Sequence, residues 1–243
     1  ALLMEGTMLG RAAGRVQTEE ELSQEATELC KGTDKAVLVY QSGQNVTRAV
    51  AFYKAAVRSG RWFIPDIYMA DVLAGLGKCP GGGSLPWPGK PGYDKARVWY
   101  PWRLMKLLER KGRRDILDRF SGSEVLPEAM TAHPEKVMLF VRPGMEDDIA
   151  RIPGLHGGTL LYSLWEGYRD SDRTAAFLKA MEALGITVKD LHTSGHADIP
   201  SLQRMADKLQ PKMILPIHTL HPEDYAGLFN FPVEIKKDGR YTL

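Results

Sequence analysis

The sequence has 243 residues, which is enough for one large domain or two small ones with a substantial hydrophobic core. Its composition, 44% hydrophobic and 26% charged, excludes a disordered or fibrous chain, and its net charge of +2 excludes nucleic-acid binding through a global field. The two cysteines, Cys30 and Cys79, cannot form a disulfide framework, and no apolar run reaches membrane-spanning length. We therefore expect a cytoplasmic protein that has no membrane partner.

Strands and helices alternate in the first part of the chain. An apolar strand over residues 1–4 is expected to end at Glu5, and Thr18 with Glu21 forms a capping box that opens a helix. The periodicity then predicts a strand over 36–40, a helix from the cap Asn45 to Gly60, a strand over 62–67 and a helix over 68–76. This alternation favours a parallel sheet with right-handed crossover connections.

The same alternation resumes after a long Gly- and Pro-rich loop over residues 78–93. The later predicted elements are a strand over 135–141, a short helix over 144–152, a strand over 158–164, a helix over 174–184 and a strand over 186–191. Near the end, Asp238-Gly239 between the strand-like pieces 233–235 and 241–243 indicates a hairpin.

Two polar residues, Ser42 and Gln44, follow the predicted strand 36–40 and precede a helix. The N–H groups at a helix N-terminus attract anions, so these residues are candidates for binding a phosphate. They are equally well explained as ordinary helix caps.

Aromatic and basic residues gather in and after the long loop. A helix is expected from Trp102, with Lys106, Arg110 and Arg113/Arg114 on one face and leucines on the opposite face. Rings that stack on bases beside cations that follow phosphates are typical of a path for single-stranded nucleic acid. The alternatives are that the rings pack the loop onto the domain and that the basic face is simply solvated. The rings concerned are Trp87, Tyr93, Trp99, Tyr100 and Trp102.

The chain's most informative stretch runs from His192-Thr-Ser-Gly-His196 through a predicted helix after Pro200 to the buried strand Leu215-Pro-Ile and His218. Groups that bind ligands collect at the ends of strands in α/β sheets, so His196 and His218 are expected to share one site. A single histidine near a strand end is more often structural. Three at this spacing, around a glycine that permits close backbone approach, support a phosphate or metal site as well as a structural role.

These motifs resemble the last two motifs of the β-CASP nucleases of the metallo-β-lactamase fold, a family that includes ribonuclease J and the cleavage-and-polyadenylation nuclease. His196 matches the family's Ser-Gly-His loop, His218 matches the histidine after an apolar Pro-containing strand, and Glu5 in Leu2-Leu-Met-Glu-Gly-Thr7 matches the acidic first motif. Residues 44–70 are similar to the start of the inserted β-CASP domain. Thr219-Leu220 departs from the usual Gly-Glu, which leaves the local loop geometry open.

The resemblance implies an α/β fold: a parallel-sheet, three-layer α/β/α β-CASP domain flanked by remnant strands of an αββα metallo-β-lactamase domain. The implied boundaries are 1–16 and 190–243 for the metallo-β-lactamase segments and 17–189 for the β-CASP domain. The family's His-x-His-x-Asp-His metal motif is absent, since His133, His156 and His221 stand apart. We therefore interpret the chain as the C-terminal part of a longer enzyme or, alternatively, as the product of a natural gene that has lost the catalytic half. We expect its unpaired sheet edge to favour homo-oligomers.

Roles for individual residues follow from the same resemblance. His218 is implied as a metal ligand, with Glu5 and His196 as catalytic residues; Glu5 is alternatively a plain strand-end cap. Phosphate or nucleic-acid contacts are expected at His192, Ser194, Gly195, Ser42, Gln44, Lys106 and Arg110. The intact enzyme would hold two zinc ions, whereas the ligands in this chain are incomplete and we expect it to be inactive by itself.

We therefore hypothesise that the chain is the C-terminal part of a metal-dependent nuclease that hydrolyses phosphodiester bonds in single-stranded RNA. DNA is a substrate that the resemblance favours less. Two alternatives remain open. One is a non-catalytic module that binds nucleic acid or a protein partner, which predicts salt-dependent binding without a metal. The other is a metallo-hydrolase of a small ester or lactam, which predicts no affinity for RNA.

Overall fold

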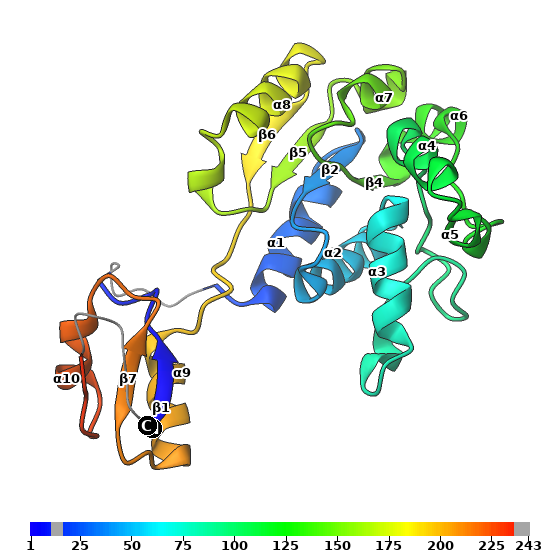
Figure 1. Ribbon diagram of the computed structural model, residues 1–243. Helices are drawn as coiled ribbons and strands as arrows, with labels where there is room; N and C mark the ends of the chain where they lie inside the picture. The colour runs from blue at the N-terminus through cyan, green and yellow to red at the C-terminus, as the bar shows by residue number, and fades with distance from the viewer. Residues whose placement is uncertain (11–16, 236–243) are drawn as a thin grey trace. The chain divides into compact units, whose positions relative to one another are not determined.

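The computed structural model describes residues 1–10 and 17–235 of the protein (Figure 1). The chain forms two compact units. Unit 1 consists of Ala1–Gln17 and Ser194–Leu243, and unit 2 consists of Thr18–Thr193. Each unit has its own core and is described by itself. Among the described residues, no helix combines the length and the apolar character needed to cross a membrane.

Unit 2 is built around a five-stranded sheet in which every pair of neighbouring strands is parallel. The strand order is β3-β4-β2-β5-β6. The strands are β2 (Val37–Tyr40), β3 (Trp62–Ile64), β4 (Val137–Phe140), β5 (Thr159–Tyr162) and β6 (Thr187–Asp190). The expected α/β class with a parallel sheet is confirmed.

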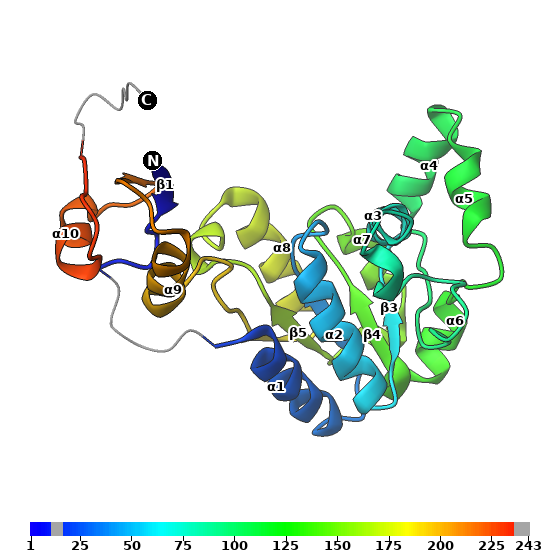
Figure 2. The same cartoon turned by 90° about the horizontal axis from the view of Figure 1, so that it is seen from below.

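Helices cover both faces of this sheet (Figure 2). Val37 and Val39 of β2 pack in one hydrophobic cluster with residues of α1, α2 and α3, whereas Leu38 packs in a second cluster with residues of α7 and α8. Side chains that alternate between two buried faces are the pattern of a parallel sheet covered on both sides. The helices of unit 2 are α1 (Glu19–Lys31), α2 (Val46–Arg58), α3 (Ile67–Gly77), α4 (Trp102–Arg110), α5 (Arg114–Arg119), α6 (Pro127–Ala132), α7 (Glu146–Ala150) and α8 (Asp172–Ala183).

Side-chain caps begin helices α1, α2 and α3 of unit 2. Thr18 and Glu21 form the expected capping box of α1, and the side chain of Asn45 accepts from the N–H of Arg48 to cap α2. The strand expected over 62–67 is wrong at its end. Pro65 has no N–H for the sheet, and the carboxylate of Asp66 accepts from the N–H of Met69 to begin α3.

The continuous basic face expected after Trp102 is also wrong. α4 ends at Arg110, and Gly112 has a φ of 65°, a backbone conformation that glycine adopts without strain. Arg113 therefore lies outside the helix and pairs with Asp115, at 2.9 Å. Only Lys106 and Arg110 remain on α4 itself.

Unit 1 contains a two-stranded parallel sheet of β1 (Leu2–Glu5) and β7 (Ile214–Ile217), with helices α9 (Ile199–Leu209) and α10 (Tyr225–Leu228). Its core comprises Met4, Leu9, Leu202, Ala206, Ile214, Tyr225 and Phe229. Val233 adds an isolated parallel bridge to Ile214. The expected hairpin at Asp238-Gly239 and the piece 241–243 lie outside the described residues.

Candidate functional site

Strand pairing in unit 1 brings the first and last motifs together although more than two hundred positions separate them in sequence. β1 and β7 are parallel and in register, with Glu5 opposite Ile217, so Glu5 and the following His218 lie at the same carboxyl edge. Beneath this edge the hydroxyl of the buried Tyr225 donates to the carbonyl of Met4, at 2.9 Å. Its ring packs so closely against Gly6 that a Cβ there would clash, which fixes the turn after Glu5.

The loop before α9 delivers the third group, His196. The backbone N–H of His196 donates to the Ser194 hydroxyl at 3.2 Å, and the next N–H, of Ala197, donates to Glu5 Oε1 at 3.0 Å. The carboxylate of Asp198 then caps α9 by accepting from the N–H of Ser201, at 2.8 Å. Leu202 and Ala206 anchor α9 in the core of unit 1, so the histidine loop has a fixed end.

Glu5, His196 and His218 form one cluster. Each has a potential ligand atom within 4.8 Å of those of the other two, and the rings of His196 and His218 lie 5.4 Å apart between centroids. Glu5 Oε2 lies 3.2 Å from His196 Nδ1. The sharing of one site by His196 and His218 is therefore present in the structure, and Glu5 belongs to the same site.

Polar contacts of the two rings indicate which ring nitrogens face outward. Because the Glu5 carboxylate lies 3.2 Å from His196 Nδ1, we assign a proton to that nitrogen, which leaves Nε2 of that ring available. Nδ1 of His218 lies 2.9 Å from Thr7 Oγ1, whose single hydrogen has an oxygen acceptor, the carbonyl of His218, at 3.2 Å. We therefore assign the Nδ1–H form to His218 too, so that both histidines present Nε2 to a ligand.

Two further features mark this edge as specialised. The backbone of His218 has a φ of 49°, a left-handed conformation that is uncommon outside glycine and concentrates at functional sites. Partial burial raises the pKa of Glu5, but hydrogen bonds from Thr7 and Ala197 and the charge of His196 outweigh that effect and hold the pKa below its ordinary value of 4.5. Glu5 is thus held as a carboxylate beside two imidazoles.

The donor set of this cluster fits zinc chemistry. Imidazole nitrogen and carboxylate oxygen are zinc ligands, and catalytic zinc sites use three protein ligands. Both oxygens of Glu5, however, already accept backbone hydrogen bonds, from Thr7 and Ala197, and Oε2 also faces His196 Nδ1. The outward atoms are therefore two ring nitrogens, one oriented by Glu5 and one by Thr7, and they would supply two ligands of a zinc site that needs three or more.

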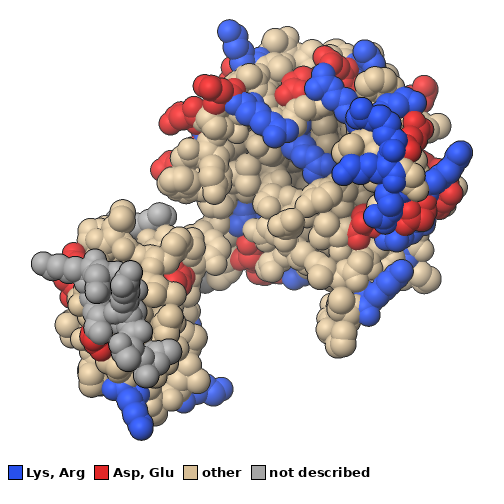
Figure 3. Space-filling view, in the orientation of Figure 1, with Lys and Arg blue, Asp and Glu red and all other residues tan. Residues whose placement is uncertain are grey.

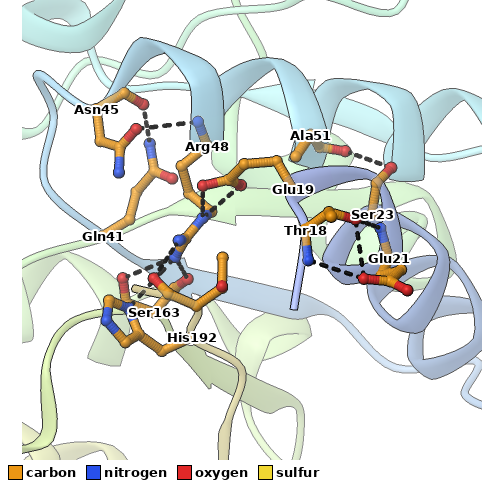
Figure 4. A network of polar contacts seen from close by, with 11 residues as sticks. Thr18, Glu19, Glu21, Ser23, Gln41, Asn45, Arg48, Ala51, Ser163 and His192 are labelled. Atoms are coloured by element: carbon orange, nitrogen blue, oxygen red, sulfur yellow. Dashed lines mark hydrogen bonds and ion pairs between the residues drawn. The ribbon is translucent and has the colours of Figure 1, made fainter. Parts of the chain in front are cut away.

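His192 lies in unit 2, where it belongs to a polar network around Arg48 (Figure 4). Arg48 is fully buried; its Nε donates to the Glu19 carboxylate at 2.7 Å and its Nη1 to the Ser163 hydroxyl at 2.6 Å. Nη2 donates to the carbonyl of Thr193 at 2.8 Å, and Nη1 lies 3.4 Å from His192 Nδ1. Burial and the charge of Arg48 lower the pKa of His192 below 6.5.

The remaining residues of the predicted phosphate-binding set lie on the surface. Ser42 and Gln44 are exposed at the start of α2, where the Ser42 hydroxyl accepts from the N–H of Gln44 at 3.4 Å and Gln44 Nε2 donates to the Tyr68 hydroxyl at 3.0 Å. Ser194 and Gly195 lie in the His196 loop, and a Cβ at Gly195 would meet no atom within 4 Å. The structure thus brings only Ser194 and Gly195 of this set beside the cluster.

The basic residues of α4 are exposed but not free. Lys106 Nζ pairs with Glu109 at 2.9 Å, and Arg110 Nε donates to the carbonyl of Lys106 at 3.4 Å. Figure 3 shows Lys and Arg side chains gathered over the part of unit 2 where α4 and α5 lie, with acidic side chains among them. Of the aromatic residues expected nearby, Trp99 is buried in the core and Trp102 is 56% exposed. Most of these rings therefore pack the fold.

Two residues that orient the predicted site were not assigned a role from the sequence. Thr7 contacts His218, and Arg48 contacts His192 and the carbonyl of Thr193. The position of Thr7, two residues beyond the strand-end Glu5, is a sequence feature that could have indicated its role. No sequence feature indicates the role of Arg48, because arginine in an amphipathic helix is ordinarily solvent-exposed.

Comparisons with known proteins bear on the same segment. Residues 184–226 match the family model RMMBL, described as the Zn-dependent metallo-hydrolase RNA specificity domain. No curated protein matches the chain. A similar solved structure is a protein of unknown function from Enterococcus faecalis, with a TM-score of 0.57 and 18% sequence identity; the match covers 98% of this chain and 50% of that one.

The family match supports the metallo-β-lactamase/β-CASP superfamily. It covers β6, the His196 loop, α9, β7 and His218, and it leaves Glu5 outside. The likeness to the solved structure concerns the fold alone, and this chain spans about half of that protein's length.

Proposed function

We propose that this chain forms the RNA-binding, phosphate-contacting part of a zinc-dependent β-CASP nuclease that hydrolyses phosphodiester bonds in single-stranded RNA. The observation that carries the proposal is the convergence of Glu5, His196 and His218 at one edge of unit 1. It gains support from the RNA specificity domain match, which includes both histidines. On this proposal unit 1 belongs to the metallo-β-lactamase domain and unit 2 is the β-CASP domain.

His196 is proposed to act at the scissile phosphate. Its Nδ1 lies 3.2 Å from the Glu5 carboxylate, which orients the ring, so that Nε2 can donate a proton to the leaving oxygen. Ser194 and Gly195 precede it in the same exposed loop and offer a hydroxyl and a backbone N–H to the phosphate oxygens. Glu5 acts through His196 and is a positioning residue.

His218 is proposed to hold zinc through Nε2, since Thr7 occupies its Nδ1. Zinc bound there would supply positive charge for the phosphate and lower the pKa of a water. Two such ions need more ligands than the described residues bring to this edge. We therefore expect the chain alone to bind RNA without cleaving it.

Substitution of the two histidines tests this proposal. Binding of a 5′-phosphorylated, single-stranded RNA oligonucleotide is measured by fluorescence anisotropy at several salt concentrations, with and without zinc. Loss of a charge-assisted contact to phosphate is worth about 1.5–3 kcal/mol, so His196→Ala is expected to weaken binding by roughly ten- to a hundredfold. His218→Asn, which tolerates the left-handed backbone, is expected to remove only the zinc-dependent part of the affinity.

His133→Gln is the matched control, because His133 is an exposed histidine of unit 2 outside the cluster. It is expected to bind RNA as the unaltered chain does. Equal affinity of His196→Ala and the control would contradict the proposal. Binding that depends on salt but responds to neither cluster histidine would instead support a non-catalytic nucleic-acid-binding module.

A further inference from the structure

Two large aromatic side chains are exposed on the turn that joins β5 to α8 in unit 2 (Figure 1). Trp165 is 49% exposed and Tyr168 is 56% exposed, at the two ends of the 3₁₀ turn η4 (Glu166–Tyr168). In the part of the chain that the structure describes, neither ring belongs to a hydrophobic core cluster. Exposed rings that serve no core are typical of binding surfaces, where Trp and Tyr are enriched.

The geometry of this aromatic pair is fixed. The ring centroids lie 5.5 Å apart and the ring planes make an angle of 87°, the edge-to-face arrangement that aromatic pairs prefer. A Cβ at Gly167 would come within 2.3 Å of the indole of Trp165, so the missing side chain lets the indole lie directly on the turn. The hydroxyl of the buried Tyr162 donates to the carbonyl of Trp165 at 3.3 Å and anchors the turn to β5. Rings that are already ordered lose little conformational entropy on binding.

The two arginines that follow the rings in sequence are engaged elsewhere. Arg169 Nη2 pairs with Asp190 at 3.0 Å, and its guanidinium carbon lies 4.8 Å from the centre of the Tyr162 ring. Arg173 donates from Nη2 to the carbonyl of Pro143 at 3.0 Å. The charge of Arg169 is thus matched by Asp190, and Arg173 is directed towards the loop after β4.

Two carboxylates beside the rings remain unpaired. Glu166 and Asp170 are exposed, and neither forms an ion pair among the residues that the structure describes. The turn therefore offers aromatic faces together with negative charge. This combination fits a guanidinium, which stacks on aromatic rings and pairs with carboxylates. It disfavours a nucleic-acid strand, because the carboxylates would repel the phosphates.

We propose that Trp165 and Tyr168 form a docking surface for an arginine-containing segment of a partner protein. A guanidinium of the partner stacks on the exposed rings and pairs with Glu166 or Asp170. Trp, Tyr and Arg are the residue types that dominate binding energy at protein interfaces, so one arginine can anchor the segment. This docking surface is separate from RNA binding and does not rest on the proposed nuclease function.

Trp102 of α4 provides an internal control for this proposal. It is exposed to the same extent as Tyr168, at 56%, but its charged neighbours Arg103 and Lys106 are cations. Lys106 lies one helical turn from Trp102 and is therefore on the same face of the helix. Cations beside the ring disfavour a guanidinium, so Trp102 is not expected to bind arginine.

NMR of the indole N–H groups in the whole chain, labelled with ¹⁵N-tryptophan, tests the proposal. The probe is a short peptide of alternating arginine and glycine that is blocked at both ends. We expect a saturable shift of the Trp165 signal and no shift of the Trp102 signal. The same peptide with glutamate in place of arginine is expected to shift neither. Absence of a Trp165 shift with the arginine peptide would overturn the proposal.

The same signals distinguish two other occupants of this surface. Addition of single-stranded RNA is expected to leave the Trp165 signal unchanged, and so is dilution of the protein alone. A shift with RNA would assign the rings to nucleobases, and a shift on dilution would assign them to a second copy of the chain. Either result would overturn the proposal.

Trp165→Ser is expected to lower the affinity for the arginine peptide by about threefold or more, because a cation–π contact is lost. Its Tm is expected to change little, since the ring lies outside the core clusters. The indole signal that is missing from this variant also identifies Trp165 in the spectrum. Trp102→Ser is the matched control and is expected to bind the peptide as the unaltered chain does. Equal affinity of the two variants would contradict the proposal.

If Trp165→Ser does not fold, the double substitution Glu166→Gln with Asp170→Asn provides the second variant, since it keeps both rings. It is expected to weaken peptide binding and to reduce its dependence on salt, because exposed ion pairs are screened. Unchanged affinity and salt dependence would overturn the proposal. These readouts do not involve Glu5, His196 or His218, so this surface can fail while the proposed nuclease function stands, and the reverse also holds.

Discussion

The two histidine sites of this protein are constructed in opposite ways. In unit 2, His192 stands beside Arg48, whose side chain is 1% exposed and binds groups from α1, β5 and the chain after β6. In unit 1, His196 is 41% exposed and is oriented by a single carboxylate, that of Glu5. The same residue type thus stands beside a buried positive charge in one unit and beside a partly exposed negative charge in the other.

This contrast separates the two tasks of polar groups in a fold. Arg48 is buried and links α1 to the chain segments that follow β5 and β6, so its loss is expected to lower the free energy of unfolding. The Glu5 cluster lies at the ends of β1 and β7 and in one loop. Its outward ring nitrogens form no hydrogen bonds that are described within the protein, so loss of the cluster is expected to lower ligand affinity more than stability. Each prediction below tests one side of this contrast.

The largest effect is expected from Arg48→Met. Removing the guanidinium leaves Glu19, Ser163 and the carbonyl of Thr193 without their partner, and breaking a buried ion pair typically destabilises a protein by about 3–5 kcal/mol. Urea denaturation followed by circular dichroism measures the free energy of unfolding. Arg58→Met is the matched control, because Arg58 pairs with Glu20 in solvent and should change stability little. Equal effects of the two substitutions would show that Arg48 is not a stability centre.

An intermediate effect is expected from pH, with a different window for each site. The folded-state pKa of Glu5 lies below its ordinary value, so its contribution to stability is present above about pH 4.5 and is lost as the pH falls through the folded pKa. The folded-state pKa of His192 is also lowered, and the unfolded chain therefore takes up a proton first as the pH falls below 6.5. As the pH falls, stability is therefore lost first below pH 6.5, because of His192, and again below about pH 4.5, because of Glu5.

Two variants separate these windows in denaturation curves recorded between about pH 2 and pH 8. His192→Gln is expected to flatten the loss of stability just below pH 6.5, and Glu5→Gln to flatten the loss below about pH 4.5. Glu5→Gln should also lower stability by about 1–2 kcal/mol at neutral pH, because charge-assisted hydrogen bonds to the carboxylate are weakened. An unaltered pH profile in either variant would contradict the electrostatic environment described for that residue.

The smallest effect is expected from Lys106→Gln on α4. A lysine that contacts phosphate contributes about one unit to the slope of log affinity against log salt concentration. Lys106 already pairs with Glu109, so we expect a smaller decrease in the slope for RNA binding. Anisotropy titrations from low to physiological salt measure this slope. A full-unit decrease would show that the Glu109 pair opens on binding and that α4 belongs to the RNA surface.

Local signals in the sequence predicted the parts of the fold that depend on local chemistry. The capping box at Thr18 and the cap at Asn45 were confirmed because a cap involves residues only three positions apart. The short helices α5, α6 and α10 were missed, since four to six residues show too little periodicity. The strand predicted over 62–67 and the predicted basic helix are longer than the observed elements, because Pro65 ends the strand and Gly112 ends the helix.

In the candidate site, too, the features that depend on local sequence were predictable and those that depend on tertiary packing were not. The meeting of His196 and His218 was predictable, because both follow strand or loop signals that point to one sheet edge. The contact of Thr7 with His218 depends on the pairing of β1 with β7, which no local pattern specifies. Arg48 was not recognised because polar residues are expected to be exposed, and only the packed structure shows that it is buried.

The most direct test of the central claim is an NMR measurement of the imidazole nitrogens in protein labelled with ¹⁵N-histidine. The account predicts that His196 and His218 both carry a proton on Nδ1, and that both Nε2 signals shift together on addition of a 5′-phosphorylated, single-stranded RNA. The signals of His133 and His156 should not move. RNA that binds without shifting either cluster histidine, or that shifts only one, would contradict the account that Glu5, His196 and His218 form a single phosphate-contacting site.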